Sequence, residues 1–287
     1  MTTALVLAQA VQVSRLVFVV TSMVTMGLSL NLAQIREPLK DLRLVILALV
    51  ANLLLVPMLG YAILLLIPLE SSMRDGLIVL SMASGAPFIP KLVQIAKGDI
   101  GYGVGLMVLL MTATVLYLPI VLPLFWTGIQ VDSWSIAQSL IELMLLPLVV
   151  GLILHVRLPH LSDRLRPVTG WISSAAIAVL VLASVALNSS YLLDLILSGR
   201  IVALLLLYAG AFAIGIALGG SHPWVRSSMG LGTATRNVSA ALVVVGQNFA
   251  GTSTLAFVVV AGVIDLLLLL SLASWFRGRT RASDLPV

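Results

Sequence analysis

The chain has 287 residues, of which 60% are hydrophobic and only 9% are charged, and its mean hydropathy is +1.16. This composition is typical of a polytopic membrane protein and excludes an ordinary soluble domain. The formal charge of +5 does not indicate nucleic-acid binding, because nearly all the basic residues lie in short loops between hydrophobic stretches, and the absence of cysteine excludes disulfides and thiolate metal sites.

A membrane helix needs about 20 apolar residues, and stretches of that kind occur nine times in the chain. They lie at roughly 16–35, 43–68, 76–97, 102–126, 135–156, 168–190, 200–220, 225–248 and 252–276. We therefore expect an all-α polytopic membrane protein, a single transmembrane domain over residues 1–287. No removable signal peptide is predicted, because the first residues lack a basic region and a cleavage site.

The basic residues are distributed unevenly between the two sides of these spans. One side, together with the C-terminal tail, holds eleven of them: Arg36, Lys40, Arg43, Lys97, Arg157, Arg164, Arg166, Arg226, Arg277, Arg279 and Arg281. The other side holds Arg15, Arg74 and Arg200. The positive-inside rule then predicts an external N-terminus and a cytoplasmic C-terminus in a cell membrane, with a bacterial inner membrane as the expected location.

The third hydrophobic stretch is interrupted where a membrane helix should be uniform. Gly85, Pro87 and Pro90 stand within it, and Lys91 follows directly. Proline removes a backbone donor and clashes with the preceding turn, so these residues predict a helix break near the middle of the membrane. Such a break survives only where protein or a water-filled cavity surrounds it. An ionisable group at this depth, such as Lys91, is by default a candidate for function.

The eighth stretch contains a second interruption, GLGTATRNVSAALVVVGQ, with Arg236 at its centre. Four polar residues surround this arginine: Thr233, Thr235, Asn237 and Ser239. They fit the lining of a substrate site, although such residues also serve as plain packing elements between membrane helices. The eighth stretch lies five positions after the third, and this odd offset predicts two halves that are inverted relative to the membrane, the plan of secondary carriers.

Two carboxylates are also predicted inside the membrane, Asp265 in the ninth span and Glu142 in the fifth. An ionised and unpaired Asp265 would cost several kcal/mol, so we expect it to be protonated or paired with Arg236 or Lys91. A pair that only locks helices together is the alternative to a role in coupling. Glu142 either takes part in charge pairing or lies near the outer interface.

The sequence lacks the motifs of the common enzyme classes. It has no GxxxxGK[ST] phosphate loop, no HExxH zinc motif and no GxSxG nucleophile elbow. Its three histidines lie at or beside predicted loops and are interpreted as solvated side chains. We therefore expect no enzymatic activity, no metal site and no cofactor.

Four segments of the chain resemble the bile acid:sodium symporter family. They are GLSLNLAQIREPLKD after the first span, NLLLVPMLGY in the second, the interrupted segment that ends in AKGD, and GTATRNVSAAL in the eighth. The resemblance implies a core domain and a panel domain. The core consists of two repeats, at approximately 43–126 and 200–276, and carries two crossing discontinuous helices. The panel consists of 16–35 and 135–190. It also implies transport by alternating access of bile acids, steroid sulfates or smaller organic or keto acids, usually with sodium.

The positions that match the family's sodium ligands carry different residues here. Alignment places Ile89, Pro90, Gly103, Met107 and Gly232 at ligand positions, and Arg236 where the family has a glutamine. Asn52 stands where the family has another glutamine, and Asn237 is retained. Because a hard cation needs several oxygen ligands, bound sodium is not expected. The hypothesis is that Lys91 and Arg236 replace the sodium ions. The expected substrate-binding residues are Lys91, Arg236, Asn237, Thr233, Thr235, Ser239 and Asn52.

Several alternatives remain at the level of sequence. The chain is a conventional sodium-coupled organic anion symporter with its ligands elsewhere, a proton-coupled carrier that uses Asp265, or a non-transporting membrane sensor or scaffold. A cation or arsenite exporter of the related efflux branch is disfavoured by the absence of cysteine. Besides the organic anion and the lipid bilayer no partner is predicted, and the sequence does not indicate the oligomeric state.

Overall fold

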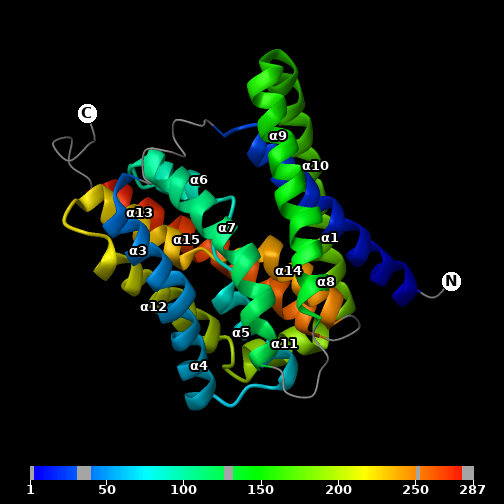
Figure 1. The fold of residues 1–287 in the computed structure, drawn as a ribbon. Coiled ribbons are helices and arrows are strands. Elements are labelled where there is room, and N and C mark those ends of the chain that lie inside the picture. Colours follow the sequence, from blue (N-terminus) through cyan, green and yellow to red (C-terminus); the bar gives the residue numbers. More distant parts are fainter. Residues whose placement is uncertain (1–2, 31–39, 126–131, 250–252, 280–287) are drawn as a thin grey trace.

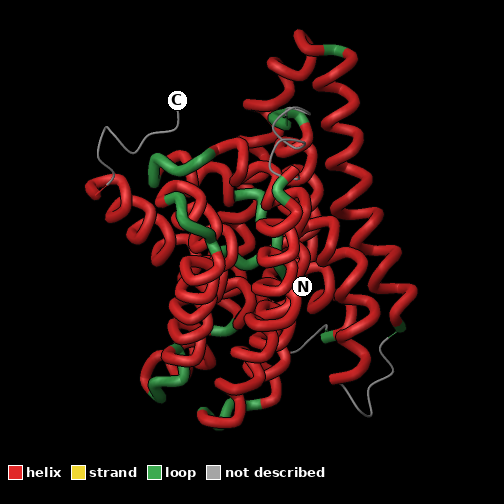
Figure 2. Tube along the Cα trace, turned by 60° about the vertical axis from the view of Figure 1, so that its left-hand side comes forward, coloured by secondary structure: helices red, strands yellow, loops and turns green. Residues whose placement is uncertain are grey.

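The computed structural model describes residues 3–30, 40–125, 132–249 and 253–279, and within these ranges all regular structure is helical (Figure 2). The helices of the first half are α1 (Thr3–Gly27), α3 (Leu42–Val50), η2 (Ala51–Leu55), α4 (Val56–Leu66), α5 (Ser71–Met82), α6 (Ile89–Ile95) and α7 (Ile100–Phe125). Those of the second half are α8 (Ser133–Leu140), η3 (Ile141–Leu145), α9 (Leu146–Arg157), α10 (Pro159–Leu187), α11 (Ser189–Leu197), α12 (Val202–Leu218), α13 (Pro223–Ala234), α14 (Val238–Asn248) and α15 (Thr254–Arg279).

Six helices in the described part of the chain are long and apolar enough to cross a membrane, or seven if α11 and α12, which meet at an angle of 69°, form one span. The two other predicted spans fall on the pairs α5–α6 and α13–α14, whose halves are each too short to cross alone. Large apolar side chains such as Leu66 and Leu197 are more than 80% exposed, as expected of a surface that faces lipid. The count of nine spans stays a prediction.

The first helix differs from the predicted span 16–35. It begins at Thr3 and ends at Gly27, so Arg15, which was predicted to lie in an outer loop, is inside α1 and only 7% exposed. A helix can include this arginine because acceptors within and beside α1 bond both Nη groups of its guanidinium. Residues 31–35 of the predicted span lie outside the described residues.

Two helices contain a short π-helical turn, η2 between α3 and α4 and η3 between α8 and α9. In each case a proline, Pro57 or Pro147, lies in the first turn of the helix that follows. The proline ring clashes with the backbone carbonyl four residues earlier and offers no N–H to bond it. The preceding turn therefore widens. The turns place Asn52 on η2 and Glu142 on η3.

The helices form two groups. The first, which we call the three-helix group, consists of α1, α10 and the helix α8–η3–α9. It stands beside the rest of the bundle, with α9 and α10 rising past α6 and α7 (Figure 1). The second, which we call the crossing group, consists of α3–η2–α4, the two broken helices, α7, α12 and α15. Loop segments run inside this bundle as well as at its ends (Figure 2).

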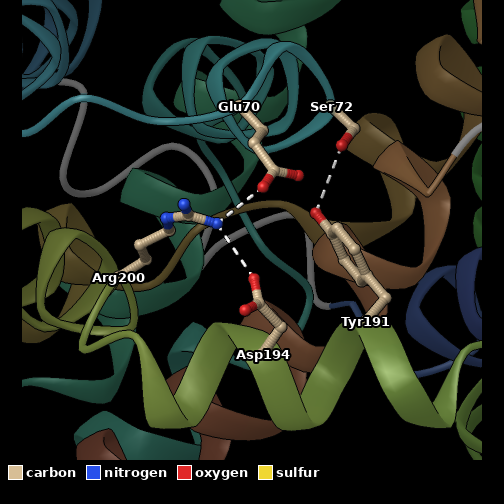
Figure 3. Close-up of polar contacts among 5 residues, drawn as sticks. All are labelled: Glu70, Ser72, Tyr191, Asp194 and Arg200. Atoms are coloured by element: carbon tan, nitrogen blue, oxygen red, sulfur yellow. Dashed lines mark hydrogen bonds and ion pairs between the residues drawn. The ribbon is translucent and has the colours of Figure 1, made fainter.

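A polar cluster on the surface connects α11 with the start of α5 (Figure 3). Arg200 Nη1 lies 2.7 Å from Glu70 Oε1 and 2.9 Å from Asp194 Oδ2. The hydroxyls of Ser72 and Tyr191 are 3.3 Å apart beside it. Both carboxylates are more than half exposed, so the cluster fixes the position of a loop and adds little to overall stability.

Candidate functional site

The first broken helix changes direction between Met82 and Ile89. Its linking residues are buried from Ala83 to Ala86, and Gly85 has φ +77°. A Cβ on Gly85 would collide with the backbone of Met111 in α7. Only glycine therefore allows this break to lie against α7. Pro87 is within the break as predicted.

Pro90 was predicted as part of the same break, but it lies in the first turn of α6. Proline is tolerated there because the first N–H groups of a helix have no partner within it. Pro90 therefore belongs to the first turn of the second half of the helix, directly after Ile89.

The second broken helix is interrupted by only three residues, Thr235, Arg236 and Asn237. Asn237 caps α14, because its Oδ1 accepts a hydrogen bond of 3.0 Å from the backbone N–H of Ala240. Thr235 Oγ1 donates back to the carbonyl of Leu231 at 2.6 Å. All three residues of the break are at most 2% exposed.

The two breaks lie against each other. The backbone N–H of Asn237 donates to the carbonyl of Ala83 at 2.9 Å, and its Nδ2 donates to the carbonyls of Ser84 and Gly85 at 3.2 and 3.1 Å. Thr114 of α7 completes the junction, since its hydroxyl accepts from the N–H of Ser84 and donates to the carbonyl of the same residue, both at 3.0 Å. Side chains and backbone thus replace the helical bonds that each break removes.

Arg236 is enclosed at this junction and is 1% exposed. Its Nη2 donates to Asn52 Oδ1 at 3.0 Å, and its Nη1 is 3.5 Å from the carbonyl of Ser81. Asn52 is fully buried and in turn donates to the carbonyl of Ala48 at 3.0 Å and to Thr233 Oγ1 at 3.2 Å. Within the described chain, Arg236 Nε has no hydrogen-bond partner. A guanidinium is therefore held at the crossing by neutral acceptors, with one donor unused.

Asp265 on α15 is the acidic residue of this region and is 6% exposed. The backbone N–H of Arg236 faces its carboxylate, and the two side chains interact electrostatically. Its Oδ1 has no hydrogen-bond partner among the described residues. Tyr208 of α12 lies nearby and donates to the carbonyl of Ala261 at 2.8 Å. The structure thus brings Asp265 to Arg236, one of the two cations predicted as its partner.

The other predicted charges lie away from the junction. Lys91 is exposed on α6, and its Nζ donates to Gln94 Oε1 at 3.0 Å. Glu142 is exposed on η3 and accepts a hydrogen bond of 2.8 Å from Gln138 Nε2. Ser239 is 3% exposed in the first turn of α14. The structure therefore brings together Arg236, Asn52, Thr233, Asn237 and Asp265, and leaves Lys91 and Glu142 outside this network.

Sequence reasoning did not single out Ser81 and Ser84, whose carbonyls face Arg236 and Asn237 of the second break, or Thr114, which bonds to Ser84. Single hydroxyl groups are common in membrane helices and carry little signal. Ser84 lies within the interrupted segment that the sequence predicted. Its position next to a helix break was therefore the one feature that could have marked it as a candidate. Nothing in the sequence around Thr114 marks it.

Comparison with known proteins places this geometry in a family context. Residues 16–195, more than half of the chain, match the Sodium Bile acid symporter family. The chain is 29% identical over 198 residues to the probable sodium/metabolite cotransporter BASS2, chloroplastic, of Oryza sativa subsp. japonica, an alignment that covers 67% of this chain and 46% of the relative. It is 23% identical over 167 residues to the corresponding BASS3 protein of Arabidopsis thaliana, covering 58% of this chain and 39% of the relative.

The aligned part of the chain thus spans less than half the length of each of these two relatives. The family match includes the first broken helix and ends before Arg236 and the second. The family match covers residues 16–195, and the structure has apolar helices long enough to cross a membrane, as a membrane transporter requires. The chain belongs to the sodium bile acid symporter family, a family of membrane transporters and not of enzymes.

Proposed function

We propose that this protein carries a small organic anion across the membrane by alternating access and without sodium. The three-helix group acts as the panel, and the crossing group acts as the core of two inverted repeats. The observation that carries the proposal is the buried guanidinium of Arg236 at the junction of the broken helices, bonded to Asn52 Oδ1. A cation that belongs to the protein is present where the family resemblance implies bound sodium.

Most residues at the resembling ligand positions support this proposal because their side chains carry no oxygen, and the side-chain oxygens of Asn52 and Asn237 already accept hydrogen bonds from Arg236 and Ala240. Ile89 and Met107 are apolar and fully buried. A Cβ on Gly232, where the resemblance expects a glutamate, would lie 2.5 Å from Leu106 Cδ2, so Leu106 would have to move to admit that side chain. A Cβ on Gly103 would lie 3.1 Å from Val93. Cations such as sodium require several oxygen ligands, and Ile89, Met107, Gly232 and Gly103 supply no side-chain oxygen.

The charge of the junction supports an anion as substrate. Arg236 has an unused Nε donor, and guanidinium groups bind carboxylate or sulfate oxygens through two parallel hydrogen bonds. The N-terminus of α14 begins directly after Asn237 and adds the positive end of a helix dipole. We assign the role of fixed cation to Arg236 alone, because Lys91 is exposed and bonded to Gln94.

A second candidate is sodium-coupled transport, which the printed names of the two relatives favour because both are called probable sodium/metabolite cotransporters. A third is proton coupling through Asp265. Protonation of this carboxylate would remove the negative charge beside Arg236 and free the guanidinium for the substrate. Both candidates predict that transport depends on a gradient of the coupled ion. Transport with Arg236 as the fixed cation does not need such a gradient.

The test is counterflow of radiolabelled small carboxylates and a steroid sulfate in proteoliposomes, with sodium or choline as the only monovalent cation. We expect equal flux in the two buffers. Arg236→Ala should reduce the flux about a hundredfold, since truncating a buried charged partner of a ligand costs about 2–5 kcal/mol. Arg236→Lys should retain part of it.

Lys91→Ala and Arg74→Ala are the matched cation variants outside the network and should keep most of the flux. A strict requirement for sodium would establish the conventional symporter instead. Flux that is unchanged in Arg236→Ala would remove this residue from the mechanism. A flux that needs a pH gradient and is lost in Asp265→Asn would favour proton coupling.

A further inference from the structure

A second buried arginine connects the two groups of helices. Arg15 of α1 is 7% exposed, and its Nη1 donates to the carbonyl of Leu242 in α14 at 2.8 Å. Its Nη2 donates to Gln12 Oε1 at 3.0 Å, and its Nε has no partner in the described part of the chain. The bond to Leu242 runs from the three-helix group to the broken helix of the crossing group.

The guanidinium of Arg15 lies directly against Gly246. A Cβ at that position would collide with the guanidinium of Arg15, so the close approach exists only because residue 246 is a glycine. The next residue, Gln247, donates through Nε2 to Ser139 Oγ of α8. Two side-chain contacts between the groups therefore lie side by side near the C-terminal end of α14.

These contacts lie at one end of the molecule. Arg236 and Asn237 precede the N-terminus of α14, whereas Gly246 and Gln247 are near its C-terminus. At that end α8 packs against α7 and α14. At the opposite end α9 packs mainly on α1, α10 and η3, and Figure 1 shows α9 standing clear of α6. The groups are thus joined toward the end of the molecule at which α14 terminates, the side that the distribution of the other basic residues predicts to face outside.

We propose that Arg15 is a gating residue: its bond to Leu242 over Gly246 holds the outer end closed and is released when the pathway opens to that side. The inference rests on the proposed alternating access. The acceptors suit a contact that must break and reform, because both are neutral oxygens. An ion pair buried at the same place would be far more costly to separate.

Two substitutions from opposite sides of the contact should have the same effect. Arg15→Leu removes the donor, and Gly246→Ala displaces the guanidinium while the charge is retained. Each should shift the population toward a state that is open at the outer end. Arg15→Lys keeps a donor for the Leu242 carbonyl and should restore part of the closure.

The readout is the reactivity of a single cysteine at position 136, introduced as Ile136→Cys in this cysteine-free chain. Ile136 is fully buried on α8, which packs on α7 and α14. The purified protein is placed in nanodiscs, where both faces are open to a water-soluble maleimide, and no substrate is added. Labelling should be about tenfold faster in Arg15→Leu and in Gly246→Ala, as expected for the loss of one hydrogen bond from a charged donor.

Arg74→Leu and Gly170→Ala serve as controls and should label at the original rate. Arg74 is an exposed arginine of α5, and a Cβ at Gly170 would meet only Thr25 Cγ2 at 3.7 Å. Unchanged labelling in either Arg15→Leu or Gly246→Ala, with the variant eluting as a single folded species, would overturn the gate. Because no substrate takes part, such a result would leave the anion proposal standing, and failure of anion counterflow would leave the labelling result valid.

Discussion

Arg236 is the buried residue on which the proposed function depends. A guanidinium removed from water is tolerated only when hydrogen bonds and nearby charge compensate for the loss of hydration. Asn52 supplies its side-chain acceptor, and the carboxyl group of Asp265 lies nearby and interacts with it electrostatically. Arg236 Nε has no hydrogen-bond partner among the described residues, and under the proposed function this is the donor that an anion would meet.

Asn52→Ala should therefore destabilise the protein through Arg236. The substitution leaves a charged donor without its acceptor, and we expect the free energy of unfolding to fall by about 1.5–3 kcal/mol. The measurement is denaturant unfolding of the purified protein in detergent. Asn188→Ala is the control, because its amide bonds only the local carbonyl of Ser184 at the end of α10. Equal losses in the two variants would contradict the role of Asn52.

At this scale, the sequence predicted part of the network. Arg236, Asn52 and Asp265 could be identified because charged and amide groups are rare among apolar spans. The position of Lys91 could not be predicted. The helix α6 starts two residues before it, and the rotation of that first turn carries its side chain to the surface. The direction of a side chain after a break depends on where the new helix begins.

At the scale of elements, the breaks are built by different means. The first uses the positive φ of Gly85 and its contact with the backbone of α7, and the second uses the capping side chain of Asn237. Both sites could be predicted from interrupted hydrophobic stretches. The limits of α1 and the start of α6 could not, because apolar residues continue across them and prolines are also accepted in a first helical turn.

Gly85→Ala tests the first break. The new Cβ would require both an unfavourable positive φ and a collision with Met111 of α7, so we expect a loss of more than about 3 kcal/mol or no folded protein. Gly199 is a matched control, since its φ is +72° and a Cβ there would meet nothing within 4 Å. Gly199→Ala should cost only about 1–2 kcal/mol. The yield and thermal stability of the two purified variants give the comparison.

If the two alanine variants lose the same stability, backbone strain alone explains the effect and the packing of the break on α7 contributes nothing. If only Gly85→Ala fails, the contact with α7 determines the geometry of the crossing. The hydrogen bonds of Thr114 to Ser84 predict the second outcome, because they fix the same segment against the same helix.

At the scale of the whole molecule, segments about 150 residues apart in sequence meet at the crossing through Asn237 and the carbonyls of Ser84 and Gly85. The sequence predicted that two interrupted segments exist and that they stand an odd number of spans apart. It did not predict the joint between α1 and α14, because a buried arginine near the N-terminus is indistinguishable from a loop residue until the start of the helix is known.

The same scale explains why a fixed cation changes the energetics of transport. A carrier that binds sodium with its substrate derives its driving force from the sodium gradient. A carrier whose cation is Arg236 has no such coupling and equilibrates or exchanges its anion. In the proposed mechanism, this difference rests on the buried side chain of Arg236 and on the leucine beside Gly232.

The most direct test is the melting temperature of the purified protein in sodium chloride and in choline chloride at equal ionic strength. A ligand that binds only the folded state raises the melting temperature as its concentration rises, by several degrees when the site is nearly saturated. We predict the same melting temperature in both salts, and an increase on adding a transported anion that is absent in Arg236→Ala. A rise that is specific to sodium and grows with its concentration would contradict the replacement of sodium by Arg236.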